Sequence, residues 1–266
     1  MKLGLAQINI AWEDKKTNKL RCSEIISKAK EKNINLIVFP EMTLTGFTMN
    51  IEGVGEFYEK SPTIDFFRNQ AVTKNINIGF GYVEKTAKSA LNKFIIINEQ
   101  GDLICNYSKI HPFSHGDESI YYEGGERLEY CEINNVLLSP LICYDLRFPE
   151  LFQICSRKSI LIIIIANWPK RRIDHWITLL KARAIENQCY VAGVNRVGCG
   201  NNILYNGNSM IINPYGIVET EKINSEGILT MDISEETVKN YRNEFKLKND
   251  RKESLYVKLY NAYSSS

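Results

Sequence analysis

The chain has 266 residues, and 33 Lys and Arg against 31 Asp and Glu give it a formal net charge of +2. This near-neutral balance gives no reason to expect a nucleic acid as a partner, because proteins that bind nucleic acids carry a basic excess or stripe. The longest apolar run, Ile160 to Ala166, has seven residues, and a membrane-spanning helix needs roughly 20. The N-terminal residues lack the apolar core of a signal peptide, so we expect a cytoplasmic protein without a membrane partner.

Strand-like and helix-like segments alternate along the first half of the chain. Predicted strands cover Lys2–Ile8, Asn35–Phe39, Ile76–Glu84, Phe94–Asn98, Leu103–Lys109 and Val136–Ile142. A helix is predicted over Lys16–Glu31, where apolar residues recur three and four positions apart. A second helix is predicted to begin at Ser61 and Pro62, since these residue types favour an N-cap and a first helical position.

The second half repeats this alternation. Ile160–Ala166 is continuous and rich in β-branched residues, as expected of a strand buried on both faces. The other predicted elements are a helix over Ile173–Gln188, strands over Tyr190–Asn195, Ser209–Asn213 and Ile217–Thr220, and a last helix capped by Ser234. No linker, repeat or composition shift divides residues 1–266, so we predict a single α/β domain that ends in a C-terminal tail of about 20 residues.

Seven cysteines are spread along the chain, an odd number without a Cys-x-x-Cys pair. This pattern argues against a disulfide framework and against a structural zinc site. Cysteine is among the most buried residue types. Apart from Cys143, we therefore expect the cysteines to be small core residues: Cys22, Cys105, Cys131, Cys155, Cys189 and Cys199.

An ionisable side chain follows each of three predicted strands, and these are Glu41, Lys109 and Cys143. Reactive groups of α/β sheets gather beyond the carboxyl ends of the strands. A carboxylate, an amine and a thiol are the groups that acyl transfer through a thioester requires. In this interpretation Glu41 takes the proton of Cys143, and Lys109 stabilises the developing oxyanion together with backbone N–H groups.

The residues around these side chains resemble the nitrilase superfamily of carbon–nitrogen hydrolases, whose members use Glu, Lys and Cys from three separate motifs. The motifs are Phe39-Pro40-Glu41-Met42, Tyr107-Ser108-Lys109-Ile110-His111 and Cys143-Tyr144-Asp145-Leu146-Arg147-Phe148-Pro149-Glu150. Their order and their spacings of 68 and 34 residues fit the family. The resemblance extends from residue 1 to about residue 245 and includes Ala166-Asn167-Trp168-Pro169 and Ala182-Arg183-Ala184-Ile185-Glu186-Asn187.

This resemblance implies a four-layer α-β-β-α sandwich and a homodimer that pairs through helices. The helix from Trp176 to Gln188 and the one after Pro149 are the candidates for that interface. It also implies a second catalytic glutamate between the lysine and the cysteine. Glu118 and Glu123 compete for this role, and we choose Glu118 because it lies seven residues before Gly125, which is the offset that the resemblance implies. Neither a metal nor an organic cofactor is implied.

Within the superfamily, the segments around Glu41, Glu118 and Asn167 look most like omega-amidases. Those enzymes hydrolyse the terminal amide of 2-oxoglutaramate or 2-oxosuccinamate to the 2-oxo acid and ammonia. The resemblance therefore implies a linear amide and water as substrates. The expected substrate-binding residues are Tyr144, Asn167, Trp168 and Arg147, and Arg172 is a second candidate for the cation that anchors a substrate carboxylate.

Several alternatives stay open from the sequence. Within the superfamily, an aliphatic amidase, an N-carbamoyl amidase and a nitrilase share the thioester chemistry. A papain-like hydrolase would instead pair Cys143 with His111, His115 or His175, and a binding protein of the same fold would have no activity. Asp145 with Arg147, and Arg183 with Glu186, are expected to be structural ion pairs.

Overall fold

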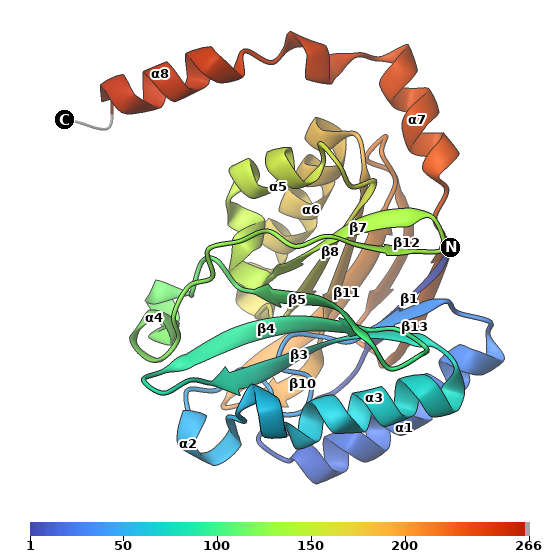
Figure 1. The fold of residues 1–266 in the computed structure, drawn as a ribbon, viewed down its shortest axis with the longest axis vertical. Helices are drawn as coiled ribbons and strands as arrows, with labels where there is room; N and C mark the ends of the chain where they lie inside the picture. The colour runs from blue at the N-terminus through green and yellow to red at the C-terminus, as the bar shows by residue number, and fades with distance from the viewer. Residues whose placement is uncertain (264–266) are drawn as a thin grey trace.

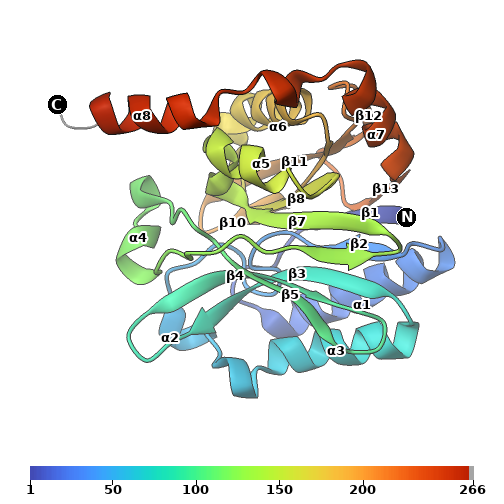
Figure 2. The same cartoon turned by 45° about the horizontal axis from the view of Figure 1, so that its top comes forward.

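A computed structural model describes residues 1–263 and shows two β-sheets packed face to face between two layers of helices (Figure 1). Residues 264–266 of the expected C-terminal tail lie outside the described residues. Figure 2 shows one pair of helices below the first sheet and another pair above the second. This is the four-layer α-β-β-α sandwich that the resemblance implied.

The first sheet has six strands, of which the central three run parallel to one another. In spatial order they are β13 (Gly227–Asp232), β1 (Lys2–Gln7), β2 (Leu36–Val38), β3 (Asn77–Lys85), β4 (Ala90–Ile97) and β5 (Leu103–Ser108).

The second sheet has seven strands, and its parallel centre is formed by β7, β8 and β9. Six strands lie in the order β10 (Val197–Gly200), β11 (Ile203–Ile212), β9 (Tyr190–Asn195), β8 (Leu161–Ala166), β7 (Val136–Ile142) and β6 (Cys131–Ile133). The seventh, β12 (Val218–Ile223), pairs with β11.

Two longer helices cover each sheet, and short helices lie within the loops that connect the other elements. The outer layers are α1 (Lys15–Glu31) with α3 (Pro62–Lys74), and α5 (Pro149–Cys155) with α6 (Ile173–Asn187). The short helices include α2 (Ile51–Val54), η1 (Tyr58–Lys60), η2 (Ser114–Gly116), α4 (Glu118–Tyr121), η3 (Cys143–Arg147) and η4 (Lys170–Arg172). The chain then continues through α7 (Glu235–Glu244), η5 (Leu247–Asp250) and α8 (Glu253–Tyr263).

The pleat of the strands divides the apolar side chains between two cores. In β1, Leu3 and Leu5 point into the core between the sheets, whereas Ala6 belongs to the core under α1 and α3. Successive side chains of a strand point to opposite faces, so a strand that is covered on both faces reads as a continuous apolar run. The predicted burial of Ile160–Ala166 is confirmed, since Leu161–Ala166 in β8 are fully buried.

The predicted helices and strands agree with the structure to within a few residues for most of the chain. Ser61 caps α3 as predicted, because its hydroxyl accepts a hydrogen bond from the N–H of Ile64. The strands β6, β10 and β13 lack a strong apolar pattern and were not predicted. The prediction that Cys199 is a core residue is wrong, since it is exposed in the β10–β11 hairpin, whereas the other five expected core cysteines are buried.

The helix that follows Ser234 is not the last one. Beyond α7 the chain crosses the outer helix layer, where Lys248 donates to the carbonyl of Ser156 and Arg251 donates to Gln153. It then forms α8, whose Tyr260 donates to Glu150 of α5 at 3.3 Å and whose end extends beyond the sandwich (Figure 1). Within residues 1–263, no helix combines the length and the hydropathy that crossing a bilayer requires.

Candidate active site

A single cavity collects most of the predicted site residues. It has a volume of about 260 Å³. Its lining includes Lys109, Cys143, Tyr144, Arg147, Asn167 and Trp168, and these residues follow strands of both sheets. Glu41 and Glu118 are completely buried behind this wall. The cavity therefore lies at the carboxyl ends of the strands, as predicted for the reactive groups.

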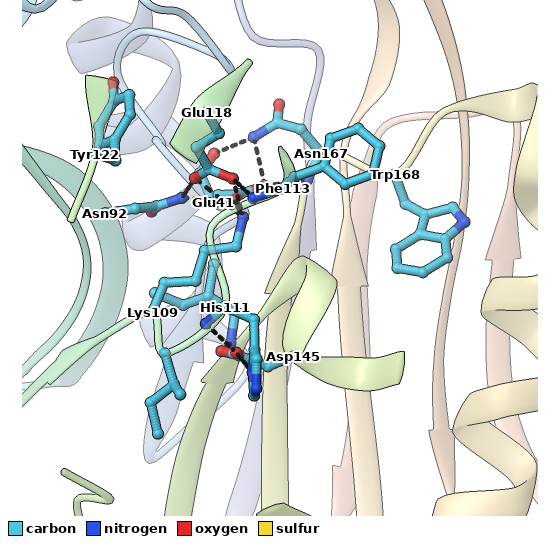
Figure 3. A network of polar contacts seen from close by, with 12 residues as sticks. Glu41, Asn92, Lys109, His111, Phe113, Glu118, Tyr122, Asp145, Asn167 and Trp168 are labelled. Carbon is cyan, nitrogen blue, oxygen red and sulfur yellow. Dashed lines mark hydrogen bonds and ion pairs between the residues drawn. The ribbon is translucent and has the colours of Figure 1, made fainter. Parts of the chain in front are cut away.

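A buried cluster of one ammonium and two carboxylates forms the floor of the cavity (Figure 3). The Lys109 Nζ lies 3.1 Å from Oε1 of Glu41 and 2.7 Å from Oε2 of Glu118. All three side chains are at most 1% exposed. Two carboxylates facing one ammonium leave the cluster one negative charge in excess, so it has the composition to accept a proton.

Glu41 is held by donors from the second sheet as well as from the first. The backbone N–H of Asn167 donates to Glu41 Oε2 at 2.8 Å, and the Asn167 side-chain amide donates to the Glu41 carbonyl at 2.6 Å. The Glu41 loop also lies directly against Gly81 of β3, where a Cβ atom would be 2.5 Å from the Met42 nitrogen. Any larger residue at position 81 would push the glutamate out of place.

Asn92 is a member of the floor that the sequence did not predict. Its side-chain amide donates to Glu41 at 2.7 Å and to Glu118 at 2.9 Å, so it joins the two carboxylates (Figure 3). It lies within β4, in a stretch without a catalytic motif. The one signal available was an amide residue in a strand whose neighbours are mostly apolar.

The structure separates the two candidates for the second glutamate. Glu118 begins α4, contacts Lys109, and accepts a hydrogen bond from the backbone N–H of Phe113 at 2.6 Å. Glu123 is exposed in the following loop. Only Glu118 is therefore positioned to orient the lysine.

Cys143 lies at a sharp turn where β7 enters η3. Its φ of 44° is in the left-handed region, which is uncommon for a residue other than glycine and is frequent at functional sites. Burial raises the pKa of the Cys143 thiol well above its ordinary value, the Glu41 carboxylate raises it further, and Lys109 opposes this. The thiol is therefore protonated at neutral pH.

The charges of the floor determine the protonation of its members. Burial lowers the pKa of Lys109, but the charges of Glu118, Glu41 and Cys143 outweigh this, and the net shift is upward. Lys109 is therefore a permanent ammonium. Burial raises the pKa of the Glu118 carboxyl, and the charge of Glu41 adds to this while Lys109 opposes it.

The prediction of an ion pair between Asp145 and Arg147 is wrong. The Asp145 carboxylate is fully buried and faces the other way, toward the Tyr107 hydroxyl and His111. Arg147 instead lies over the Trp168 ring and contacts His175. The pair between Arg183 and Glu186 is confirmed at 3.0 Å.

Three arginines, Arg147, Arg171 and Arg172, line the mouth of the cavity. None of them forms an ion pair with Asp or Glu in the described part of the chain. Arg172 lies over the Phe113 ring at 5.1 Å, and burial lowers its pKa. The mouth therefore presents positive charge to a ligand. No group of His, Cys, Asp and Glu side chains suited to hold a metal ion occurs within residues 1–263.

Comparison with known proteins agrees with this geometry. Residues 2–243 match the family model for carbon–nitrogen hydrolases. The chain is 34% identical to an omega-amidase of Yersinia enterocolitica, over 92% of this chain and 94% of that protein. It is 32% identical to a 2-oxoglutaramate amidase of Bacillus subtilis, over 96% of this chain and 98% of that protein.

A solved structure gives the same result for the fold. A CN-hydrolase superfamily protein of Xanthomonas campestris, with an arsenic adduct in its active site, superposes with a TM-score of 0.89 at 30% identity. The match covers 94% of this chain and 97% of that one. The chain belongs to the carbon–nitrogen hydrolase family, and it is an amide-hydrolysing enzyme.

Proposed function

We propose that the protein cleaves the terminal amide of a small 2-oxo dicarboxylate monoamide, 2-oxoglutaramate or 2-oxosuccinamate, through a thioester on Cys143. The observation that carries this proposal is the arrangement of the cavity. Its floor holds a buried Glu41–Lys109–Glu118 cluster beside Cys143, and its mouth holds arginines without carboxylate partners.

In the first half of the reaction, Glu41 takes the proton of Cys143 and the thiolate attacks the amide carbon. The pKa of the thiol is raised, so the transfer of this proton during the attack is what makes the sulfur nucleophilic. Lys109 and backbone N–H groups after Cys143 stabilise the negative oxygen of the tetrahedral intermediate. The C–N bond then breaks, the nitrogen takes the proton from Glu41, and ammonia leaves a thioester behind.

In the second half, water replaces ammonia. Glu41 takes a proton from the water molecule, the hydroxide adds to the thioester carbon, and Lys109 again faces the oxyanion. The C–S bond breaks, and the sulfur recovers its proton from Glu41. The sum is one amide and one water converted into one carboxylic acid and one ammonia, with the enzyme unchanged.

The mouth supports an anionic substrate. Arg147 and Arg172 are half-buried and lack a carboxylate partner in the described chain, and guanidinium groups bind carboxylates through charge-assisted hydrogen bonds. The aromatic rings of Tyr144 and Trp168 and the side chain of Asn167 complete the lining between mouth and floor. The names of the relatives, an omega-amidase and a 2-oxoglutaramate amidase, support the same substrate class.

Ammonia release from 2-oxoglutaramate tests the proposal. We expect steady release by the wild-type enzyme and none by Cys143→Ser, with a neutral amide of similar length turned over less efficiently. Absence of release above the Cys143→Ser control would remove this substrate. Turnover of only a neutral amide, a ureido acid or a nitrile would instead favour one of the other superfamily activities.

The histidines give little support to a papain-like mechanism. His111 faces Asp145, and His175 contacts Arg147. His115 lines the cavity from η2, near the mouth residue Phe113. A carboxylate, rather than an imidazole, therefore serves as the base for Cys143 in our proposal.

The protein also has features that support a homodimer in a reducing compartment. Ile154 on α5 and Ile185 on α6 are about half exposed, and apolar side chains on an outer helix layer favour pairing with a second copy. All seven cysteines are free, which suits a cytoplasmic enzyme with a thiol nucleophile.

A further inference from the structure

Lys109 and Cys143 belong to different sheets. Lys109 follows β5 at the edge of the first sheet, and Cys143 follows β7 in the second. Hydrogen bonds between strands fix positions within a sheet, but they do not fix one sheet against the other. Something else must hold the ammonium and the thiol at a constant separation.

The carboxylate of Asp145 contacts both sheets at this level. Its Oδ2 accepts hydrogen bonds from the Tyr107 hydroxyl at 2.8 Å and from the Ile142 N–H at 3.1 Å. Its Oδ1 accepts from the His111 N–H at 3.0 Å and faces His111 Nδ1 at 3.0 Å. Tyr107 and His111 belong to the first sheet's side, and Ile142 belongs to the second.

These partners bracket the two reactive residues along the chain. Tyr107 and His111 each lie two residues from Lys109, while Ile142 and Asp145 enclose Cys143. Figure 3 shows the Asp145–His111 pair beside the chain that carries Lys109. The His111 ring is stacked on Phe148 with centroids 3.6 Å apart, and this stacking restrains the position of His111 as well.

The burial of Asp145 indicates that this arrangement has a role. The residue is 0% exposed and is not among the residues that line the cavity. A buried carboxylate is costly unless donors surround it, and here both oxygens are satisfied. The turn that it supports holds Cys143 in the left-handed region at φ 44°, a conformation that persists only where the surroundings impose it.

We propose that Asp145 is a positioning residue that fixes the Lys109 ammonium against the Cys143 thiol across the two sheets. It touches neither substrate nor the reacting atoms, and it acts through Tyr107, His111 and the Ile142 N–H. The inference rests on the proposed role of Cys143 as nucleophile, because only then does the lysine–sulfur separation affect the rate.

Asp145→Asn and Tyr107→Phe test this inference in the full-length enzyme. All variants carry Cys199→Ser, because Cys199 is an exposed thiol that iodoacetamide would also alkylate. The active sites are first counted by stoichiometric alkylation of Cys143 with iodoacetamide. Per counted site, we expect kcat to fall about 100-fold in Asp145→Asn, since a small misplacement of reacting groups costs this much. We expect a smaller fall in Tyr107→Phe and little change in KM in either variant.

The pH profile of alkylation separates positioning from simple loss of stability. Lys109 lowers the pKa of Cys143, so a displaced lysine shifts the half-maximal alkylation rate to higher pH. Tyr107→Phe keeps the charge of Asp145, and a shift shared by both variants therefore reports geometry and not charge.

Asn187→Ala is the matched control. Asn187 is equally buried and hydrogen-bonded, but it precedes β9 at the opposite end of the strands. It should lose stability while keeping kcat per site and the alkylation profile of the wild type. A wild-type kcat and alkylation profile in both Asp145→Asn and Tyr107→Phe would overturn the inference. If Asp145→Asn does not fold, Tyr107→Phe decides alone. If no amide releases ammonia, the proposed function fails, whereas the alkylation profile still tests whether Asp145 positions Lys109 against Cys143.

Discussion

The floor and the mouth of the cavity are built in opposite ways. At the floor, Glu41, Lys109 and Glu118 are completely buried and every charge faces a partner. At the mouth, Arg147, Arg171 and Arg172 are partly or fully exposed and lack carboxylate partners in the described chain. Paired charges in a dry environment are strong and rigid, whereas unpaired charges near water are available to a ligand.

Under the proposed function, this difference gives the two regions separate tasks. The floor would act on any amide carbon that reaches Cys143, because in that mechanism its groups only move protons or stabilise an oxyanion. The mouth would decide which substrate binds, because its side chains would contact what lies beyond the amide. Substitutions at the floor should therefore change kcat for every substrate, and substitutions at the mouth should change KM for some substrates.

Glu41→Gln should have the largest effect. Loss of the base should lower kcat/KM about 1,000-fold for charged and neutral amides alike. The same substitution should speed the alkylation of Cys143 at neutral pH, because the negative charge of Glu41 raises the pKa of the thiol and its removal increases the thiolate fraction. Ammonia release and iodoacetamide labelling, measured on one preparation, check the fall of kcat/KM and the rise of the alkylation rate.

Slower hydrolysis together with faster alkylation distinguishes a base from a structural residue. A variant that merely loosens the floor would lose activity and alkylate more slowly, since Lys109 would no longer favour the thiolate. A parallel fall of hydrolysis and alkylation would thus contradict the assignment of Glu41 as the base.

A smaller effect is expected for Glu118→Gln, with Glu123→Gln as its neighbouring control. Glu118 holds Lys109 with a 2.7 Å ion pair, so its neutral replacement should lower kcat about 100-fold through misplacement of the lysine. Glu123 is exposed, and its replacement should leave kcat and KM unchanged. Initial rates of both variants with one amide suffice, and equal rates would show that Glu118 has no special role.

The expectation that Glu41, Lys109 and Cys143 lie close together came from local motifs after strong strands. Glu41, Lys109 and Cys143 follow runs of apolar residues whose ends are easily recognised, and parallel strands bring such ends together. Asn92 and Asp145 were missed or misassigned for the opposite reason. Their partners lie far away in the sequence, at separations of 51 residues for Asn92 to Glu41 and 38 for Asp145 to Tyr107.

The fold shows the same division between local and distant information. Elements such as β8 and α3 were predicted because burial on both faces and an N-cap leave clear patterns. The exposure of Cys199 and the course of the chain through α8 depend on where a hairpin and a terminal helix lie against the rest of the molecule. Local sequence contains little information about either.

Arg172→Gln should have the smallest effect on chemistry and the most selective one on binding. Its guanidinium is held over the Phe113 ring at 5.1 Å, and it is close enough to Cys143 for the charge of that residue to influence the pKa of the arginine. Loss of one charge-assisted hydrogen bond should raise KM for 2-oxoglutaramate about tenfold. The kcat value for that substrate, and both constants for a neutral amide, should stay close to those of the wild type.

Arg171→Gln, at an exposed neighbour on the same mouth, is the control for a general loss of positive charge. An equal rise of KM in both variants would mean that the mouth attracts anions only through its net charge, whereas a rise confined to Arg172→Gln would identify the side chain that holds the substrate carboxylate.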